Sequence, residues 1–141
     1  MNGNINRAEI KRKLVNGFSE IGEILGLNSI DIREDKNSTS MYLVGTNALE
    51  LEIDWHENVL YMYIVHLIDG KIPSNDIIYK YDDGAWCRIY IDEVYSKKNP
   101  ICKLINRTRP NFLLELFQYY KKLIESDPSR LLPYFDVNLN T

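Results

Sequence analysis

A run of strict alternation between residues 49 and 56 constrains the fold more than any other feature of this chain. Apolar side chains take one phase and polar side chains the other: Leu49, Leu51, Ile53 and Trp55 against Glu50, Glu52, Asp54 and His56. Successive side chains of a β-strand point to opposite faces, so the pattern predicts a strand with one dry and one wet face. A turn at 56–58 and a run at 59–68 that is apolar in both phases follow. They predict a β-hairpin whose second strand is covered on each face.

The segments on either side of this hairpin predict helices. Apolar residues recur at helical spacing from Ile10 to Leu25, after an N-cap at Asn6, and Gly26 is placed to end that helix. A second stripe of this kind covers 113–124, and a short helical turn restarts after Asp127. We expect these apolar stripes to pack on the sheet.

Further strands are predicted at 30–32, 39–44, 76–81 and 86–94, where short apolar runs are separated by turn residues. The order is helix, about six short strands, helix, helix. It predicts the α+β class, with one antiparallel sheet of about six strands and the N-terminal helix and one or two C-terminal helices on one face. We find no linker or repeat, so residues 1–141 are expected to form a single globular domain.

Composition and charge narrow the class of protein. The chain is 45% hydrophobic and 26% charged, as in folded proteins, and its N-terminus lacks the apolar region of a signal peptide. No apolar run is long enough for a membrane span, so we expect a cytoplasmic protein with Cys87 and Cys102 as thiols. Residues 29–95 carry thirteen acidic and five basic side chains, a balance of −8. Such an acidic middle argues against nucleic-acid binding.

The polar phase of the 49–56 strand is the first candidate site. If its apolar phase faces the helices, its three carboxylates point away from them, and aromatic residues of the neighbouring strands fall on the same face by phase. Acids with large aromatics are typical of a protein interface, where aromatic side chains anchor and charges steer. The alternative is a solvated face whose tyrosines cover the sheet. The predicted partner-binding residues are Glu50, Glu52, Asp54, Tyr61, Tyr63, Trp86, Arg88 and Tyr90.

The sequence gives less support to a catalytic or metal site than to this interface. His66 shares the phase of apolar residues and is predicted to be a core histidine, while His56 belongs to an exposed turn. Cys102 has no local signature of a nucleophile. Two histidines and two cysteines without paired spacing predict no metal site, and no cofactor motif is present. The basic loop at 97–109 either contacts phosphates or an acidic partner, or is simply solvated.

Three stretches carry a resemblance to a known class: LELEIDW, NVLYMYIV and YKYDDGAWCRIYIDE. In its general plan the chain resembles the small bacterial immunity proteins that neutralise polymorphic or contact-dependent toxins. The resemblance implies a non-enzymatic cytoplasmic protein that binds and blocks a cognate toxin domain, such as a nuclease with a basic cleft. The chain resembles less closely the secretion chaperones of bacterial injection systems, which dimerise. A third hypothesis, an uncharacterised enzyme, predicts a deep pocket around His66 or Cys102.

Overall fold

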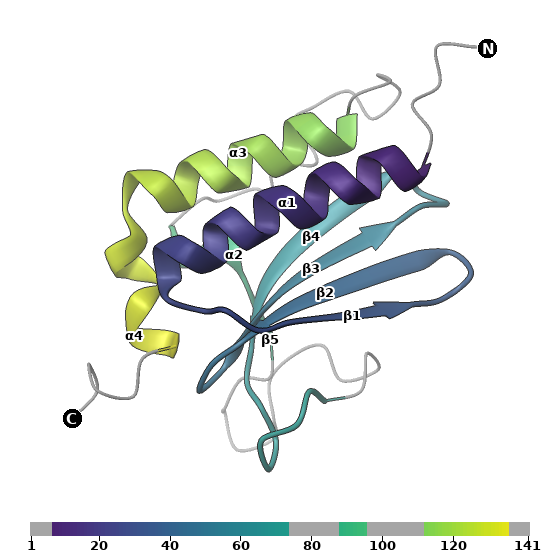
Figure 1. Ribbon diagram of the computed structural model, residues 1–141. Coiled ribbons are helices and arrows are strands. Elements are labelled where there is room, and N and C mark those ends of the chain that lie inside the picture. Colours follow the sequence, from purple (N-terminus) through teal and green to yellow (C-terminus); the bar gives the residue numbers. More distant parts are fainter. Residues whose placement is uncertain (1–6, 74–87, 96–111, 136–141) are drawn as a thin grey trace.

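The computed structural model describes residues 7–73, 88–95 and 112–135, and these form a sheet covered on one face by helices (Figure 1). This confirms the α+β class. The elements in chain order are α1 (Arg7–Leu25), β1 (Ile30–Glu34), β2 (Ser38–Val44), β3 (Ala48–Asp54), β4 (Val59–Val65), β5 (Arg88–Tyr90), α2 (Ile91–Val94), α3 (Phe112–Ser126), a 3-10 turn (Pro128–Arg130) and α4 (Leu132–Phe135).

The sheet is a meander in the order β1-β2-β3-β4-β5, and all neighbouring strands are antiparallel. The described residues contribute five strands where the sequence predicts about six, and the predicted strand at 76–81 lies outside them. The hairpin predicted around residue 57 is confirmed as β3 and β4, with Leu51 opposite Met62.

The strand predicted at 86–94 is wrong over its second half. The strand β5 ends at Tyr90, and Ile91–Val94 form the helix α2. A strand would direct Ile91 and Val94 to opposite faces, whereas one helical turn directs Ile91, Val94 and Tyr95 into the same core. Asp92 is buried in this turn and accepts a hydrogen bond from the hydroxyl of Tyr120 at 2.9 Å.

The helix α1 ends as its sequence predicts. Gly26 has a φ of 75°, in the left-handed region that glycine adopts without steric cost. The N–H of Leu27 donates to the carbonyl of Gly22 at 2.8 Å, and that of Gly26 donates to Glu23 at 3.4 Å. This pair of bonds is the Schellman motif, which satisfies carbonyls at the end of a helix.

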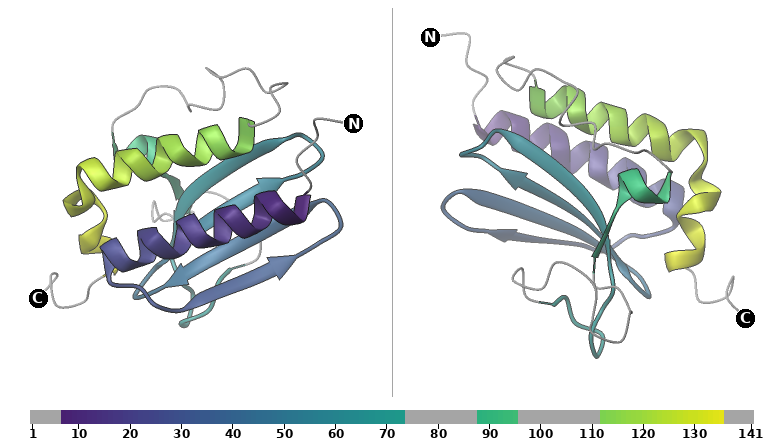
Figure 2. Two further views of the ribbon diagram at one scale, coloured as in Figure 1. Left: turned by 45° about the horizontal axis from the view of Figure 1, so that its top comes forward. Right: turned by 180° about the vertical axis from the view of Figure 1, so that it is seen from behind.

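The helices α1 and α3 lie side by side on one face of the sheet (Figure 2). Gly17 of α1 allows this close approach, because a Cβ there would collide with the ring of Phe117. An ion pair between Lys121 and Glu20, at 2.5 Å, joins the two helices at the surface. Beneath them the apolar phase of β3 and the facing phase of β4 are fully buried, as predicted: Leu49, Leu51, Ile53, Leu60, Met62 and Ile64.

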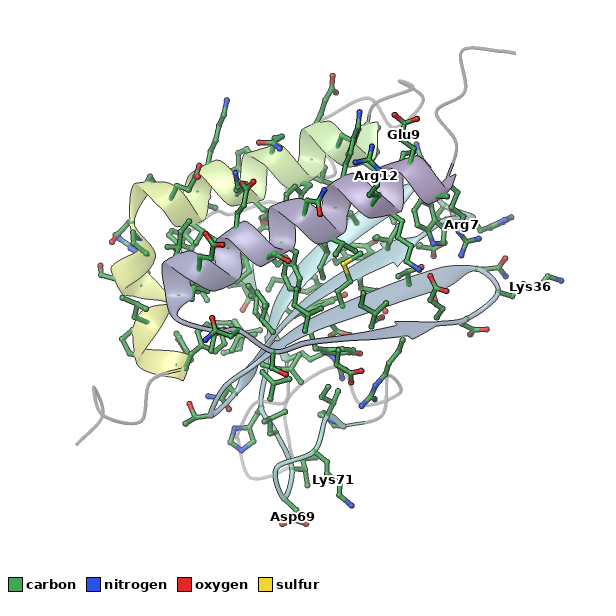
Figure 3. All side chains as sticks on the ribbon, in the orientation of Figure 1. Arg7, Glu9, Arg12, Lys36, Asp69 and Lys71 are labelled. Carbon is green, nitrogen blue, oxygen red and sulfur yellow. The ribbon has the colours of Figure 1, made fainter. Side chains whose placement is uncertain are left out.

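The opposite, outer face of the sheet carries a second, smaller apolar cluster. Tyr42, Ala48, Tyr63 and Val65 are buried there, and Leu67 and Ile72 pack against them from the segment after β4. That segment turns at Asp69 and Gly70, both with positive φ, and its tip lies on the side of the sheet away from the helices (Figure 3). The strand β4 is therefore covered on both faces, as its sequence predicts.

Candidate functional site

The structure places the described members of the predicted partner-binding set on the outer face of the sheet. Glu50 lies opposite Tyr63, Glu52 opposite Tyr61, and Tyr63 opposite Tyr90. Residues directly opposite in an antiparallel pair share a face, so the phase assignment made from the sequence is confirmed for these residues. Trp86 lies outside the described residues.

Glu50 is not solvated, and the prediction that it lies on a wet face is wrong. Its side chain is only 1% exposed. One carboxylate oxygen accepts from Nε of Arg88 at 2.7 Å, and the other accepts from the hydroxyl of Tyr42 at 2.7 Å. These three residues, Tyr42, Glu50 and Arg88, form what we call the buried network. A carboxylate can be buried when an opposite charge and hydrogen bonds replace its water.

Glu52, two residues along β3, remains half-buried. It accepts a hydrogen bond from the hydroxyl of Tyr63 at 3.2 Å. Burial raises the pKa of the Glu52 carboxyl, and the negative charge of Glu50 raises it further. Burial likewise raises the pKa of the Tyr63 hydroxyl, with a further contribution from Glu52. This part of the face therefore holds an oriented acid whose ionisation is opposed by burial and by Glu50, and the positive charge of Arg88 offsets this only in part.

Three tyrosines form a single aromatic group beside this acid. The ring centroids of Tyr63 and Tyr90 lie 4.9 Å apart, and that of Tyr61 lies 6.1 Å from Tyr63 and 6.2 Å from Tyr90. Such spacings are those of favourable aromatic contacts. Tyr63 is buried, while Tyr61 and Tyr90 are partly exposed.

Asp54 has a local structural role in addition to its place on this face. Its carboxylate accepts from the backbone N–H of Glu57 at 2.9 Å, inside the turn between β3 and β4. The same turn places Asn58 at a positive φ of 53°. An aspartate that caps its own turn is common in short connections. Asp54 is half-exposed, so part of its surface still faces solvent.

The partly exposed residues on this face are Glu52, Asp54, Tyr61 and Tyr90, which we call the acid–tyrosine patch. The buried network and Tyr63 lie on the same face of the sheet as this patch and support the patch from within. Sequence reasoning missed Tyr42, although the even phase of the predicted 39–44 strand offered a signal, since its neighbour β3 presents Glu50 in the matching phase.

Of the candidate catalytic residues, the structure describes His56 and His66. His66 is exposed, so the prediction of a core histidine is wrong: β4 ends at Val65 and the chain leaves the sheet there. His56 is exposed in its turn, as predicted. Cys87, Cys102 and the basic loop at 97–109 lie outside the described residues.

A surface hollow of about 350 Å³ lies elsewhere, along α1, and another of about 150 Å³ lies between the end of α1 and the start of β1. Neither is lined by a residue of the acid–tyrosine patch. Within residues 7–73, 88–95 and 112–135, no three histidine, cysteine or acidic side chains lie close enough together to hold a metal ion. Over the same ranges, no helix has both the length and the apolar character needed to cross a membrane.

No protein-family model matches the chain, and no curated protein or solved structure matches it.

Proposed function

We propose that this protein is a non-enzymatic protein-binding module, and that its partner is a bacterial toxin domain whose active site it blocks. In this proposal it acts as an immunity protein in the cytoplasm of a bacterium. One observation carries the proposal: the acid–tyrosine patch presents two half-exposed acids and two half-exposed tyrosines on a support that is fixed from within.

The fixed side chains beneath the acid–tyrosine patch favour binding of a partner. Association costs free energy for every side chain that must be ordered at the interface, and a patch that is already ordered avoids part of that cost. Tyr63 orients Glu52 through its hydroxyl, and its ring contacts Tyr61 and Tyr90. Tyrosine is enriched among the residues that contribute most binding energy, which suits Tyr61 and Tyr90 as anchors.

The electrostatics favour a basic partner. Burial and the charge of Glu50 raise the pKa of Glu52, and a lysine or arginine of the partner would add a second opposite charge to that of Arg88. Nuclease domains carry basic clefts for nucleic acid, so an acidic surface competes there with phosphate. Glu50 itself is already paired with Arg88 and serves this proposal as support, with Glu52 and Asp54 as the contacts.

The experiment that tests the proposal is affinity capture from the native cells, with mass spectrometry to identify the partner. The patch variant is Glu52→Lys, and the matched control is Glu23→Lys, an exposed glutamate on α1 at the helical face of the molecule. We expect one stoichiometric partner that the wild type and the control retain and the patch variant loses. Expression of that partner alone should then be toxic to a bacterial host, and co-expression of the wild-type protein should remove the toxicity.

Two results would contradict the proposal. Equal capture by the patch variant and the control would place the interface elsewhere on the molecule. An export substrate as the captured partner, without toxicity, would favour the secretion chaperone instead.

A further inference from the structure

The strand β1 forms one edge of the described sheet. It pairs with β2 along one side, and it is the outermost strand of the meander (Figures 1 and 2). Two backbone hydrogen bonds flank its ladder with β2, one at each end: the N–H of Asp35 donates to Ser38 at 2.9 Å, and that of Val44 donates to Ser29 at 3.3 Å. An edge strand presents a row of backbone donors and acceptors to whatever lies beside it.

These two bonds determine which backbone groups of β1 point outward. In an antiparallel ladder, hydrogen-bonded pairs alternate with pairs that are not bonded to each other. Asp35 with Ser38 and Ser29 with Val44 belong to the bonded kind, and the register places Asp31 and Arg33 in the same series. The N–H and C=O groups of Ile30, Ile32 and Glu34 therefore point away from β2.

We propose that a second copy of this chain pairs with β1, antiparallel, about a two-fold axis at Ile32. Ile32 then faces Ile32 of the partner subunit, and Ile30 faces Glu34 of the partner subunit. All three residues are those whose backbone groups point outward, so each of these pairs exchanges both of its N–H···O=C bonds. The pairing joins the two sheets into one continuous sheet.

The side chains of β1 complement themselves in this register. Asp31 lies opposite Arg33 of the partner subunit, and Arg33 lies opposite the partner's Asp31, so both ion pairs repeat across the axis. Within one chain the two side chains already approach to 3.2 Å, and both are about half-exposed and available to a partner. Ile32 is one of the few large apolar residues of the described chain with substantial exposure, 39%, and the pairing covers it.

The two adjacent registers with the same backbone geometry are disfavoured. A slip of the axis from residue 32 to residue 31 places Asp31 opposite the partner's Asp31, and a slip to residue 33 places Arg33 opposite the partner's Arg33. Like charges directly opposite each other destabilise a strand pair. Charges on an edge strand generally prevent association, and on β1 they exclude the slipped registers while favouring this one.

The expected dimer is weak, because pairing of two five-residue strands alone buries less than the roughly 1,000 Å² of a stable interface. Sedimentation of the full chain over a wide concentration range should therefore show a reversible monomer–dimer equilibrium. Arg33→Asp brings like charges together at both pairs and should weaken the dimer about tenfold. The exchanged pair, Asp31→Arg with Arg33→Asp, restores opposite charges and should return the dimer to its wild-type affinity.

The matched control is Arg130→Asp. Arg130 and Asp127 form an exposed ion pair with the same 3.2 Å separation, away from β1, so this variant should dimerise like the wild type. Amide hydrogen exchange provides the second measurement. The N–H of Ile32 should exchange more slowly as the protein concentration rises, while that of Arg33, which faces β2, should be protected at every concentration.

Four results would overturn the proposal: a monomer at every concentration, a dimer that Arg33→Asp leaves unchanged, a failure of the exchanged pair to restore it, or an Ile32 amide already protected in the monomer. The last would mean that another segment, and not a second copy, covers the edge.

Discussion

Removing Arg88 while Glu50 stays in place tests whether the buried network supports the outer face. In Arg88→Met the carboxylate of Glu50, 1% exposed, keeps the hydroxyl of Tyr42 but loses its positive partner at 2.7 Å. Breaking a buried ion pair by removal of one partner costs about 3–5 kcal/mol, because the remaining charge is buried without compensation. A domain of this length has a total stability of about 7–20 kcal/mol, so this loss is a large part of it.

The assay is urea unfolding at pH 7, followed by circular dichroism, with the slope of the transition checked for constancy. The double variant Glu50→Gln with Arg88→Met is the control, since it removes the charge together with its partner. A neutral amide still accepts from Tyr42 and needs no counter-charge, so the double variant should be more stable than Arg88→Met alone. A loss below about 1 kcal/mol in Arg88→Met, or no recovery in the double variant, would refute the reasoning.

Three further predictions concern other parts of the molecule. Gly17→Leu should destabilise by about 1–3 kcal/mol in thermal or urea unfolding, because the new side chain collides with Phe117; an unchanged midpoint would contradict the close packing of α1 on α3. Glu52→Gln should raise the melting temperature at pH 7 and have little effect below about pH 4. The sign follows from the raised pKa of Glu52: the wild type loses stability as the pH rises from 4.5 through the pKa of the folded state, and the variant lacks this loss. A stabilisation of the variant that persists at low pH would contradict the prediction. Arg7→Ala should lower the free energy of unfolding by about 0.5–1 kcal/mol, since the guanidinium lies 4.6 Å from the centre of the Trp55 ring. Urea unfolding that detects no loss of stability would contradict a stabilising contact between these two residues.

Local periodicity was enough to predict most of the fold. Alternation along β3 and helical spacing along α1 each predict a face that packs on the core, and the structure buries the apolar residues that those patterns select within the two elements. Gly26 shows the same for a helix end, because its left-handed conformation lets the chain satisfy the preceding carbonyls. These features depend on residues close together in the chain.

Features that depend on distant residues were not predictable in the same way. The burial of Glu50 requires Arg88, which lies 38 residues further along the chain, and no local sequence pattern predicts that the two residues pair. The switch from β5 to α2 at Ile91 was missed because alternation and one helical turn fit the same short sequence, and only the core beneath it decides between them. His66 was misassigned because a strand's phase says nothing of where the strand ends.

The affinity of the isolated partner for the wild type and for Tyr61→Ala tests the central claim most directly. If the acid–tyrosine patch is the interface, truncation of this anchor should weaken binding about 30-fold, which corresponds to about 2 kcal/mol. Glu52→Lys, measured beside it, should slow association and flatten its dependence on salt. Unchanged affinity in both variants, with the fold intact by circular dichroism, would contradict the claim that this face binds the partner.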